Sequence, residues 1–422
     1  MARNRRTEHI GAGSWPERFD AAHSDLGGYA GMRYGCLSLT DDRARSNKKR
    51  MHSMATTAQT AHTVTVNLGP QHPSTHGVLR VMVELDGEYV VSCRPVIGYL
   101  HRGLERMFES RTYKQTVPFT DRMDYCAALN GNLAISQAIE RLGGLEPPER
   151  AQYLRVLLCE LNRIVSHLVF LGTFATDIGA TTVFLYAFRE REKALDLLEG
   201  MTGARLTYNY IRPGGVPADM PEGFQEGLSQ FLDELLIALD ENDKLLSGNR
   251  IFRARLEGVG VLSPETAAAY GASGPVARGS GLNFDIRKCE PYEVYDRLDF
   301  DIPVFTTCDC YARYQVRIEE MRQSARIIRQ CLRDMPQGEV MTKMPKIFKP
   351  PVGEAYSRTE SPRGELSFYM VSDGGTNPAR VHARTPSFVH LGLLPAMLPG
   401  CKIADVIAIL GSLDTVLGEV DR

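Results

Sequence analysis

The sequence predicts an α+β fold dominated by helices, in which a helical bundle is flanked by small antiparallel sheets. Apolar residues recur with a helical period along four stretches of the chain. Short runs in which apolar and polar residues alternate, as in half-buried strands, lie before and after these stretches. The chain of 422 residues is 43% hydrophobic and 24% charged, which suffices for a large core without disulfide bonds.

Residues 1–60 differ in composition from the rest of the chain. They hold ten Lys or Arg and six Asp or Glu, whereas residues 61–422 carry a net negative charge. No apolar period runs through them, which predicts a disordered tail. Their arginines are typical of an organellar transit peptide, but their acidic residues argue against one. A misassigned start upstream of Met51 or Met54 explains the tail equally well, and we expect one folded domain at residues 61–422.

The folded part is predicted to open with a small antiparallel sheet. Residues 64–68 and 79–85 alternate between apolar and polar side chains. Asp86-Gly87 predicts a two-residue turn into a further strand at 88–92, because both turn positions favour residues that tolerate positive φ. The connection between the first two strands is the loop GPQHPSTHG at 69–77.

Four helices are predicted after this sheet. Asp121 can cap the first, which runs to about Leu142 and ends at a pair of glycines. The second follows Pro147-Pro148, and the third spans about 224–246. The fourth carries a near-heptad apolar seam that favours close packing between helices, formed by Ile318, Met321, Ala325, Ile328, Leu332 and Met335.

A second hairpin is predicted near the C-terminus. Its two alternating runs lie at 365–372 and 379–384, on either side of Asp373-Gly374-Gly375. The segment before it, from about Met335 to Pro362, holds five prolines and is expected to be a long loop.

The most apolar stretch, residues 164–188, is long enough to cross a bilayer. It contains His167 and Asp177, and an ionisable residue at membrane depth is costly. We therefore expect a buried core segment, and a protein that acts at a membrane would lie on it.

Charge and cysteine content exclude some classes of function. The net charge of −2 gives no electrostatic footprint for nucleic acid. The nine cysteines form no C-x-x-C pair, so no recognisable zinc, iron–sulfur or nickel site is present. The nearest approach is Cys308-Asp309-Cys310, whose one-residue spacing is unusual for metal ligation and favours a structural role.

The loop at 69–77 is the first candidate for chemistry. It holds His72 and His76 between prolines and glycines, which restrict the backbone and allow close approach. An imidazole exchanges its proton near neutral pH, so such a loop suits proton delivery to a bound acceptor. A structural histidine at a hairpin is the alternative that the spacing alone favours.

Two arginines and a tyrosine form the second group of candidates. Arg102 and Arg122 are permanent cations that can stabilise negative charge on a nearby redox centre or anion. Tyr125 is expected in the first turn of the predicted helix after Asp121, with its phenol available as a hydrogen-bond donor. Surface arginines and a core tyrosine are the alternative interpretation.

Asp177 is the third candidate. A carboxylate within a strongly apolar stretch requires a histidine or arginine partner, or its pKa rises. A functional and a structural role are equally compatible with this position.

Nine sequence blocks, in order along residues 62–422, resemble the D subunit of NADH:quinone oxidoreductase (respiratory complex I), the quinone-site family related to the large subunit of nickel–iron hydrogenases. The resemblance implies a hydrogenase-large-subunit-like bundle that holds no metal of its own. The matching blocks are GPQHPSTHG at 69, IGYLHRGLE at 97, DRMDY at 121, TDIGA at 176, IRPGGV at 211, RGSGLNFDIRK at 278, YDRLDFDIP at 295, RIEEMRQS at 317 and the terminal GEVDR.

The resemblance also implies roles for single residues. His76 and Tyr125 match the pair that hydrogen-bonds the two carbonyls of the quinone substrate, and Asp177 matches the carboxylate paired with that histidine. Arg102 and Arg122 match arginines beside an iron–sulfur cluster held by a neighbouring subunit. This chain alone would hold no cofactor.

One position departs from the family pattern. Many relatives carry a histidine beside that cluster within the segment at 204–208, and this sequence has Thr207 there. The resemblance therefore does not imply that a residue of this chain makes the potential of the cluster depend on pH.

The implied partners are the cluster-bearing B subunit, the C subunit, a membrane-arm subunit at the quinone entrance and, indirectly, the NADH-oxidising module, with no nucleic acid. The expected location is the cytoplasmic face of a bacterial membrane, or alternatively the matrix face of the mitochondrial inner membrane. An architectural subunit without quinone contact and a hydrogenase-type metalloenzyme remain the other hypotheses. The motifs do not distinguish among quinones or electron donors.

Overall fold

The computed structural model describes residues 63–71 and 78–422. The predicted tail at 1–60 and the candidates His72 and His76 therefore lie outside the described residues, and the predictions made for them remain predictions.

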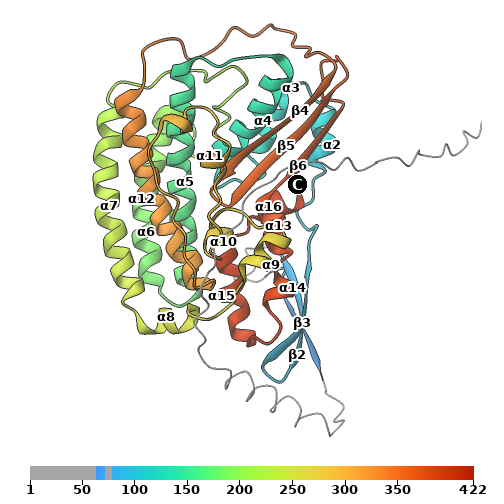
Figure 1. The fold of residues 1–422 in the computed structure, drawn as a ribbon, viewed down its shortest axis with the longest axis vertical. Coiled ribbons are helices and arrows are strands. Elements are labelled where there is room, and N and C mark those ends of the chain that lie inside the picture. The colour runs from blue at the N-terminus through green and yellow to red at the C-terminus, as the bar shows by residue number, and fades with distance from the viewer. Residues whose placement is uncertain (1–62, 72–77) are drawn as a thin grey trace, which may run out of the picture. The chain divides into compact units, whose positions relative to one another are not determined.

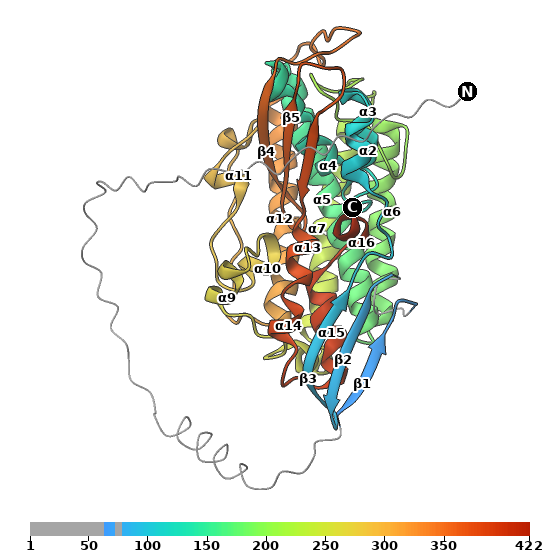
Figure 2. The same ribbon diagram turned by 90° about the vertical axis from the view of Figure 1, so that its right-hand side faces the viewer.

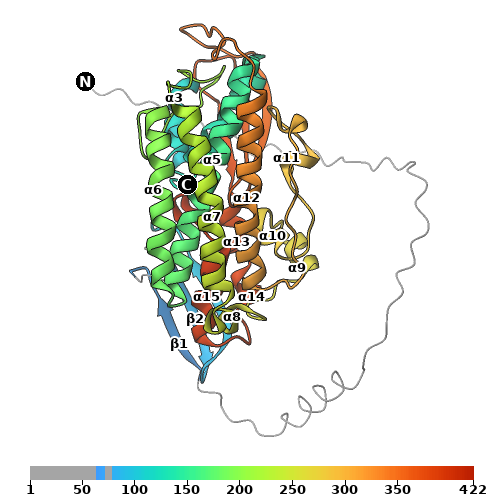
Figure 3. The ribbon, with the colours of Figure 1, turned by 90° about the vertical axis from the view of Figure 1, so that its left-hand side faces the viewer.

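Four long helices of the described chain form a helical bundle, as predicted, but one of them, α6, was not among the predicted helices (Figures 1 and 3). The helix α5 packs against α6 and α12, and α7 packs against the same two helices, so that the four close a ring. The apolar seam predicted for α12 is buried from Ile318 to Ile328. The bounds are Glu149–Asp177 for α5, Thr181–Thr202 for α6, Phe224–Ser247 for α7 and Cys310–Asp334 for α12.

The apolar stretch at 164–188 is not one segment. The helix α5 ends at Asp177, Gly179 adopts a φ of 96°, and α6 begins at Thr181. The predicted core placement is correct for the α5 part but wrong for the start of α6, where Leu185 is 64% exposed and Tyr186 40% exposed. None of the helices within the described ranges combines the length and the apolar character that a membrane span requires.

The N-terminal sheet has the strand order β1-β2-β3 and is antiparallel throughout, as predicted. Its bounds are Val64–Leu68, Arg80–Asp86 and Tyr89–Val96. The tight turn lies one residue later than predicted, at Gly87-Glu88, because Asp86 still pairs with Tyr89. Among these turn residues only Gly87 has a positive φ, of 61°.

The second sheet has the order β4-β5-β6 and packs on the helix α4. The strands β5 and β6 are the predicted hairpin, but β4 lies in the segment predicted to be a loop. The prolines of that segment precede β4 or follow it, and its buried side chains are mostly polar, so no apolar alternation marks it. The bounds are Gly353–Ser361 for β4, Gly364–Ser372 for β5, Arg380–Arg384 for β6 and Ala128–Gly143 for α4.

The last helices of the chain lie between the two sheets (Figure 2). The helix α15 packs on α5 and α12, α13 packs on α16 and β5, and α14 packs on β3. Their bounds are Pro386–Leu391 for α13, Leu394–Met397 for α14, Ile403–Leu413 for α15 and Leu417–Asp421 for α16. The remaining short helices are α2 (Leu104–Glu109), α3 (Tyr113–Thr120), α8 (Arg250–Leu256), α9 (Pro264–Ala269), α10 (Gly274–Arg278), α11 (Ile286–Cys289) and the 3₁₀ turn η2 (Tyr295–Arg297).

These elements confirm the predicted fold class, α+β with a predominance of helix around small antiparallel sheets. Its core contains many charged side chains, which the sequence pattern does not predict. The buried Arg278, for example, contacts Glu320 at 2.6 Å and Glu360 at 2.8 Å. Buried ions require such pairing, since an uncompensated charge away from water costs several kcal/mol.

Candidate functional site

Tyr125 lies on a turn between α3 and α4, in the segment 121–127. The prediction that it lies in the first turn of a helix is wrong, because α4 begins only at Ala128 and Asp121 does not cap it. Backbone hydrogen bonds from Met123 to Thr120 and from Ala127 to Asp124, both 3.1 Å, fold this segment into successive turns. The Tyr125 side chain is 40% exposed, so it can reach a molecule outside the core.

Two buried carboxylates hold this turn. Asp121 accepts hydrogen bonds from the Asn132 side chain at 2.7 Å and from the Asn209 backbone at 3.1 Å. Burial raises the pKa of Asp121 to about 6 in spite of these bonds. Asp124 accepts from the backbone of Cys126 at 3.1 Å and from Arg363 at 2.7 Å. The turn that presents Tyr125 is thus fixed from both ends.

Arg363 connects this turn to other parts of the fold. Its side chain is buried in the β4–β5 connection, and it donates to Asp124, to the Ser166 hydroxyl at 3.1 Å and to the Asp414 carbonyl at 2.8 Å. A second bond reaches the Asp414 carboxylate at 3.3 Å. These carboxylates hold the pKa of Arg363 above its usual range although burial opposes this, so it stays charged. The guanidinium joins the turn, α5 and the segment between α15 and α16.

Arg102 and Arg122, the two candidate cations, are brought together. The Arg102 Nη2 donates to the Arg122 carbonyl at 2.6 Å. The Arg122 Nη1 donates to the Pro118 carbonyl at 2.7 Å. Both residues are exposed, so two permanent positive charges stand at the surface beside the turn that carries Tyr125.

The C-terminal helix α16 supports both segments. Asp421 accepts hydrogen bonds from the backbone of Gly98 at 2.8 Å and of Leu100 at 2.7 Å, which anchors the loop that leads to Arg102. Gly418 packs against the other segment, since a Cβ at this position would stand 2.5 Å from the Met123 carbonyl and 3.2 Å from the Tyr125 ring. Glycine is therefore required where α16 meets the turn.

Asp177 is the last residue of α5, and it is half-buried. Contrary to expectation, it does not lie inside an apolar segment, because the stretch breaks there. Its carboxylate faces α15, since a Cβ on Gly411 would stand 3.6 Å from its Oδ2. A carboxylate at a helix C-terminus is opposed by the helix dipole, so other groups must favour this position. The predicted partner, His76, lies outside the described residues.

Thr207 lies in a loop tied to the same turn. Thr207 and Asn209 both adopt left-handed backbone conformations, with φ of 50° and 44°. The Asn209 backbone bond to Asp121 attaches this loop to the residue before Arg122. Thr207 therefore lies two residues from the bond that joins its loop to the turn, and its hydroxyl does not titrate near neutral pH.

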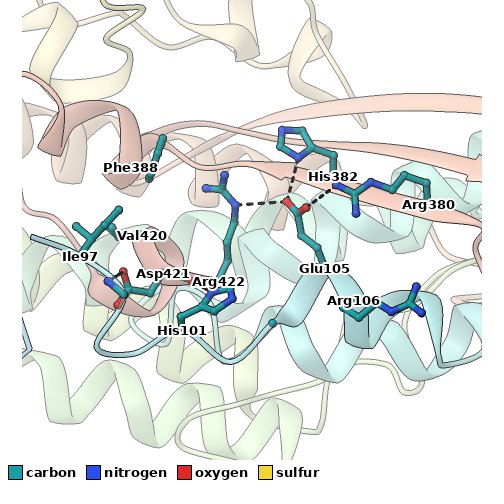
Figure 4. Close-up of a pocket in the computed structure, with 12 residues that line it drawn as sticks. Ile97, His101, Glu105, Arg106, Arg380, His382, Phe388, Val420, Asp421 and Arg422 are labelled. Carbon is teal, nitrogen blue, oxygen red and sulfur yellow. Dashed lines mark hydrogen bonds and ion pairs between the residues drawn. The ribbon is translucent and has the colours of Figure 1, made fainter. Parts of the chain in front are cut away.

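A cavity of about 510 Å³ lies between the 97–106 segment, β6 and the C-terminus (Figure 4). Glu105 points into it and binds Arg380 at 3.0 Å, His382 at 3.0 Å and Arg422 at 3.4 Å. Neither Tyr125 nor Asp177 lines this cavity, and the two candidate arginines do not line it either. Since its central carboxylate is already paired with two arginines and contacts a histidine, we place no catalytic function there.

The cysteines of the Cys308-Asp309-Cys310 segment point to different partners. The Cys308 thiol is 3.3 Å from the Thr306 carbonyl, and the Cys310 thiol is buried 3.7 Å from the Ala408 carbonyl. Within residues 63–71 and 78–422, no group of three or more His, Cys, Asp or Glu residues is placed to hold a metal ion.

The structure thus brings Tyr125, Arg102 and Arg122 to one surface and places Asp177 at the end of α5 against α15. Sequence reasoning missed Asp124, Arg363 and Gly418 as positioning residues. Asp124 and Gly418 lie within the DRMDY and GEVDR blocks. Their place there indicates that the two residues matter but does not indicate what they contact. No local pattern indicates the pairing of Arg363 with residues far away in sequence.

Comparison with known proteins connects this chain to a family. The model of the family described as the 49 kDa subunit of respiratory-chain NADH dehydrogenase matches residues 177–352 and 344–422. The chain is 54% identical over 356 residues to the D subunit of NADH-quinone oxidoreductase from Desulforamulus reducens, covering 84% of this chain and 97% of that protein. It is 51% identical over 358 residues to the protein of the same name from Carboxydothermus hydrogenoformans, covering 85% and 98%.

Proposed function

The chain belongs to the family of the 49 kDa subunit of respiratory-chain NADH dehydrogenase, the D subunit of NADH-quinone oxidoreductase, and we propose that within this complex it forms the chamber in which quinone is reduced. It is accordingly a subunit of an oxidoreductase, complex I, and other complex I subunits are its partners. The finer proposal assigns the residues that contact quinone and supply its protons.

The observation that carries the proposal is the presentation of Tyr125. The residue is 40% exposed on a turn that buried carboxylates hold in place, so that its position is fixed while part of it remains accessible. Burial raises the pKa of Tyr125, with contributions from the neighbouring acidic groups, so the hydroxyl stays protonated at neutral pH. A neutral phenol is a hydrogen-bond donor and suits a quinone carbonyl.

Two-electron reduction of a quinone requires two protons. We assign one to Tyr125 and the other to His76, each within hydrogen-bond reach of one carbonyl of the head group. Asp177 would orient His76 and stabilise its imidazolium form, as a carboxylate does in a catalytic triad. His76 lies outside the described residues, so its assignment rests on the family pattern.

Arg102 and Arg122 are assigned to the side of the site from which electrons come. Both arginines are exposed and joined by a hydrogen bond from the Arg102 side chain to the Arg122 backbone, and they can stabilise negative charge on a group held by a neighbouring protein. The iron–sulfur cluster of that neighbour, the B subunit, supplies the electrons. The C subunit and a membrane-arm subunit at the quinone entrance are the other proposed contacts, and the NADH-oxidising module acts indirectly.

The proposed location is the cytoplasmic face of a bacterial membrane, with the matrix face of the mitochondrial inner membrane as the alternative. A second candidate function is that of a scaffold subunit without quinone contact. The extensive buried ion pairing of the bundle, exemplified by Arg278, Glu320 and Glu360, favours a rigid structural role of this kind.

The test compares Tyr125→Phe and His76→Ala in the assembled complex. Each variant is expected to lower NADH:quinone turnover by about 100-fold, because one proton donor is lost and the other remains. NADH oxidation with a soluble artificial electron acceptor, which bypasses the quinone, should be unchanged and serves as the internal control. Near-wild-type quinone turnover in both variants would show that the chemical assignment is wrong and would favour the scaffold.

A Gly418→Ala variant is expected to displace the 122–125 turn and to lower quinone reductase activity of the assembled complex by about tenfold, since small misplacements of positioning groups have large effects. Steady-state turnover of the purified complex measures it. The control is Gly200→Ala in α6, where nothing lies within 4 Å of the added Cβ and no loss is expected. Equal activity of the two variants would show that the packing of Gly418 against the turn does not matter for quinone reduction.

A further inference from the structure

A buried carboxyl that the proposed chemistry does not use stands behind Tyr125. Glu419 is in α16, directly after the Gly418 that packs on the Tyr125 ring, and its side chain is completely buried. The Oε1 atom accepts a hydrogen bond from the Ser387 backbone at 3.0 Å. Among the described residues the Oε2 atom has no hydrogen-bond partner. A buried carboxyl oxygen left in this way favours the protonated form of the acid.

The nearby cation, Arg363, already bonds to other acidic groups. The Arg363 guanidinium bonds to Asp124 at 2.7 Å and to Asp414 at 3.3 Å, and its Nε bonds to a backbone carbonyl. Arg317 lies 3.8 Å from the second Asp414 oxygen. No ion pair to Glu419 is formed within the described part of the chain, so two carboxylates near Arg363 are paired and Glu419 is the third.

We propose that Glu419 holds the proton that returns Tyr125 to its neutral form after Tyr125 has donated its own proton to the quinone. This inference rests on the proposed function of Tyr125 and adds a proton store to it. Three observations carry it: one oxygen of the buried carboxyl has no hydrogen-bond partner among the described residues, the neighbouring Gly418 lies so close that an added Cβ would stand 3.2 Å from the Tyr125 ring, and Arg363 is bonded to the other two acids.

The proton balance has three steps. The Tyr125 O–H bond breaks as its proton passes to an oxygen of the two-electron-reduced quinone, which leaves a phenolate. The Glu419 O–H bond then breaks and the Tyr125 O–H bond forms again, which leaves Glu419 as a carboxylate within range of Arg363. A proton from solvent restores Glu419, so one proton has passed from solvent to quinone and no electron has moved among these residues.

The electrostatics of the surrounding groups agree with this role. Burial and the charge of Asp124 raise the pKa of Glu419 to about 8, and Arg363 opposes the rise. The groups that face this cluster are Asp124 and Cys126 on the turn, Arg363 on the β4–β5 connection, Asp414 before α16, Arg317 on α12 and His390 on α13. Burial raises the pKa of Cys126 to about 12 and lowers that of His390 to about 3, so both are neutral near pH 7.

The test is a Glu419→Gln variant of the complete complex, with quinone turnover measured from pH 5 to pH 9. The wild-type enzyme should hold a plateau up to about pH 8, where Glu419 loses its proton. The variant must take each proton directly from solvent, so its turnover should be about tenfold lower at neutral pH and should rise steadily as the pH falls. The KM for quinone should be unchanged, because Glu419 does not contact the substrate.

A second readout is infrared difference spectroscopy of the complex during reduction, which detects the C=O band of a protonated carboxyl. A band sensitive to D₂O that Glu419→Gln removes and Glu419→Asp shifts would support the assignment. The control variant is Glu190→Gln in α6, an equally buried acid that is paired with Lys193 at 3.0 Å. It should leave both the pH profile and the band unchanged.

The outcomes separate this inference from the function on which it rests. If Tyr125→Phe retains full quinone turnover, the proposed function fails, whatever Glu419 does. If Tyr125→Phe is impaired but Glu419→Gln keeps the wild-type profile and band, the proton store alone is refuted. If Glu419→Gln does not assemble, Glu419→Asp is the deciding variant. The inference is overturned if the carboxyl band of Glu419→Asp is not shifted, or if the activity plateau of the wild-type enzyme already ends near pH 6.

Discussion

Replacement of Arg363 by methionine is expected to destabilise the folded chain by about 3 to 5 kcal/mol, the cost of leaving a buried ion without its partner. The guanidinium is the only group of the described chain that donates to Asp124, Ser166 and Asp414 together. Methionine fills a similar volume but donates no hydrogen bond. The amount of assembled complex and its thermal unfolding temperature, compared with the wild type, measure the loss.

The loss should depend on pH in a defined direction. Burial raises the pKa of Asp124, and Arg363 opposes the rise, so removal of Arg363 raises the folded-state pKa further. In the unfolded chain this pKa stays near about 3.9. A carboxyl whose pKa is higher in the folded than in the unfolded state does not change the free energy of unfolding below the unfolded-state pKa. Above that pKa it lowers the free energy of unfolding as the pH rises. The variant should therefore be least impaired near about pH 4 and most impaired at neutral and alkaline pH.

Two comparisons make this result specific. The control Arg329→Met removes an exposed arginine that pairs with Asp233 at the surface, and it should change stability by less than about 1 kcal/mol. The double variant with Asp124→Asn removes one of the abandoned carboxylates and should recover part of the loss. Equal unfolding temperatures for the Arg363 and Arg329 variants would refute the role of Arg363 as a structural hub.

The sequence pattern predicts those parts of this fold that have a local period. The seam of α12 and the first sheet follow from alternation and heptad spacing, and both are present. The strand β4 was missed because its inward positions are filled by polar residues. Ser357, for example, is buried there and donates to the Ala134 carbonyl at 2.7 Å. Hydrogen bonds to a distant helix replace the apolar contacts on which strand prediction relies.

The same limit applies to the site. Asp121 precedes an apolar period and resembles an N-cap, but its carboxylate is used by Asn132 and Asn209, so the helix begins seven residues later. Competition between a local cap and a long-range bond is decided by the tertiary structure. Arg363 and Glu419 were missed for a related reason, since their partners lie on elements remote in sequence. Motif resemblance marked the GEVDR segment that holds Glu419 but not the segment of Arg363, and only the geometry indicates what the two side chains contact.

An Asp177→Asn variant is expected to lower quinone turnover by about 10² to 10⁴-fold, the range that general acid–base catalysis contributes, with the loss of an orienting carboxylate beside a catalytic imidazole at its upper end. The amide has the same shape, so the end of α5 and its packing against α15 should be kept. The neutral amide can no longer stabilise an imidazolium by its charge. Turnover with quinone should therefore be impaired, while the signals of the partner's iron–sulfur clusters should be unchanged.

The matched control is Asp334→Asn, because Asp334 is likewise the last residue of a long helix, α12, and its ion pair within the described residues is with the exposed Arg333. If both variants assemble and only Asp177→Asn loses turnover, the effect belongs to the position of Asp177 and not to a charge at a helix end. If Asp177→Asn instead prevents assembly or removes the cluster signals, the carboxylate acts in holding the fold. That result would leave Tyr125 and His76 as the proposed proton donors without an orienting group.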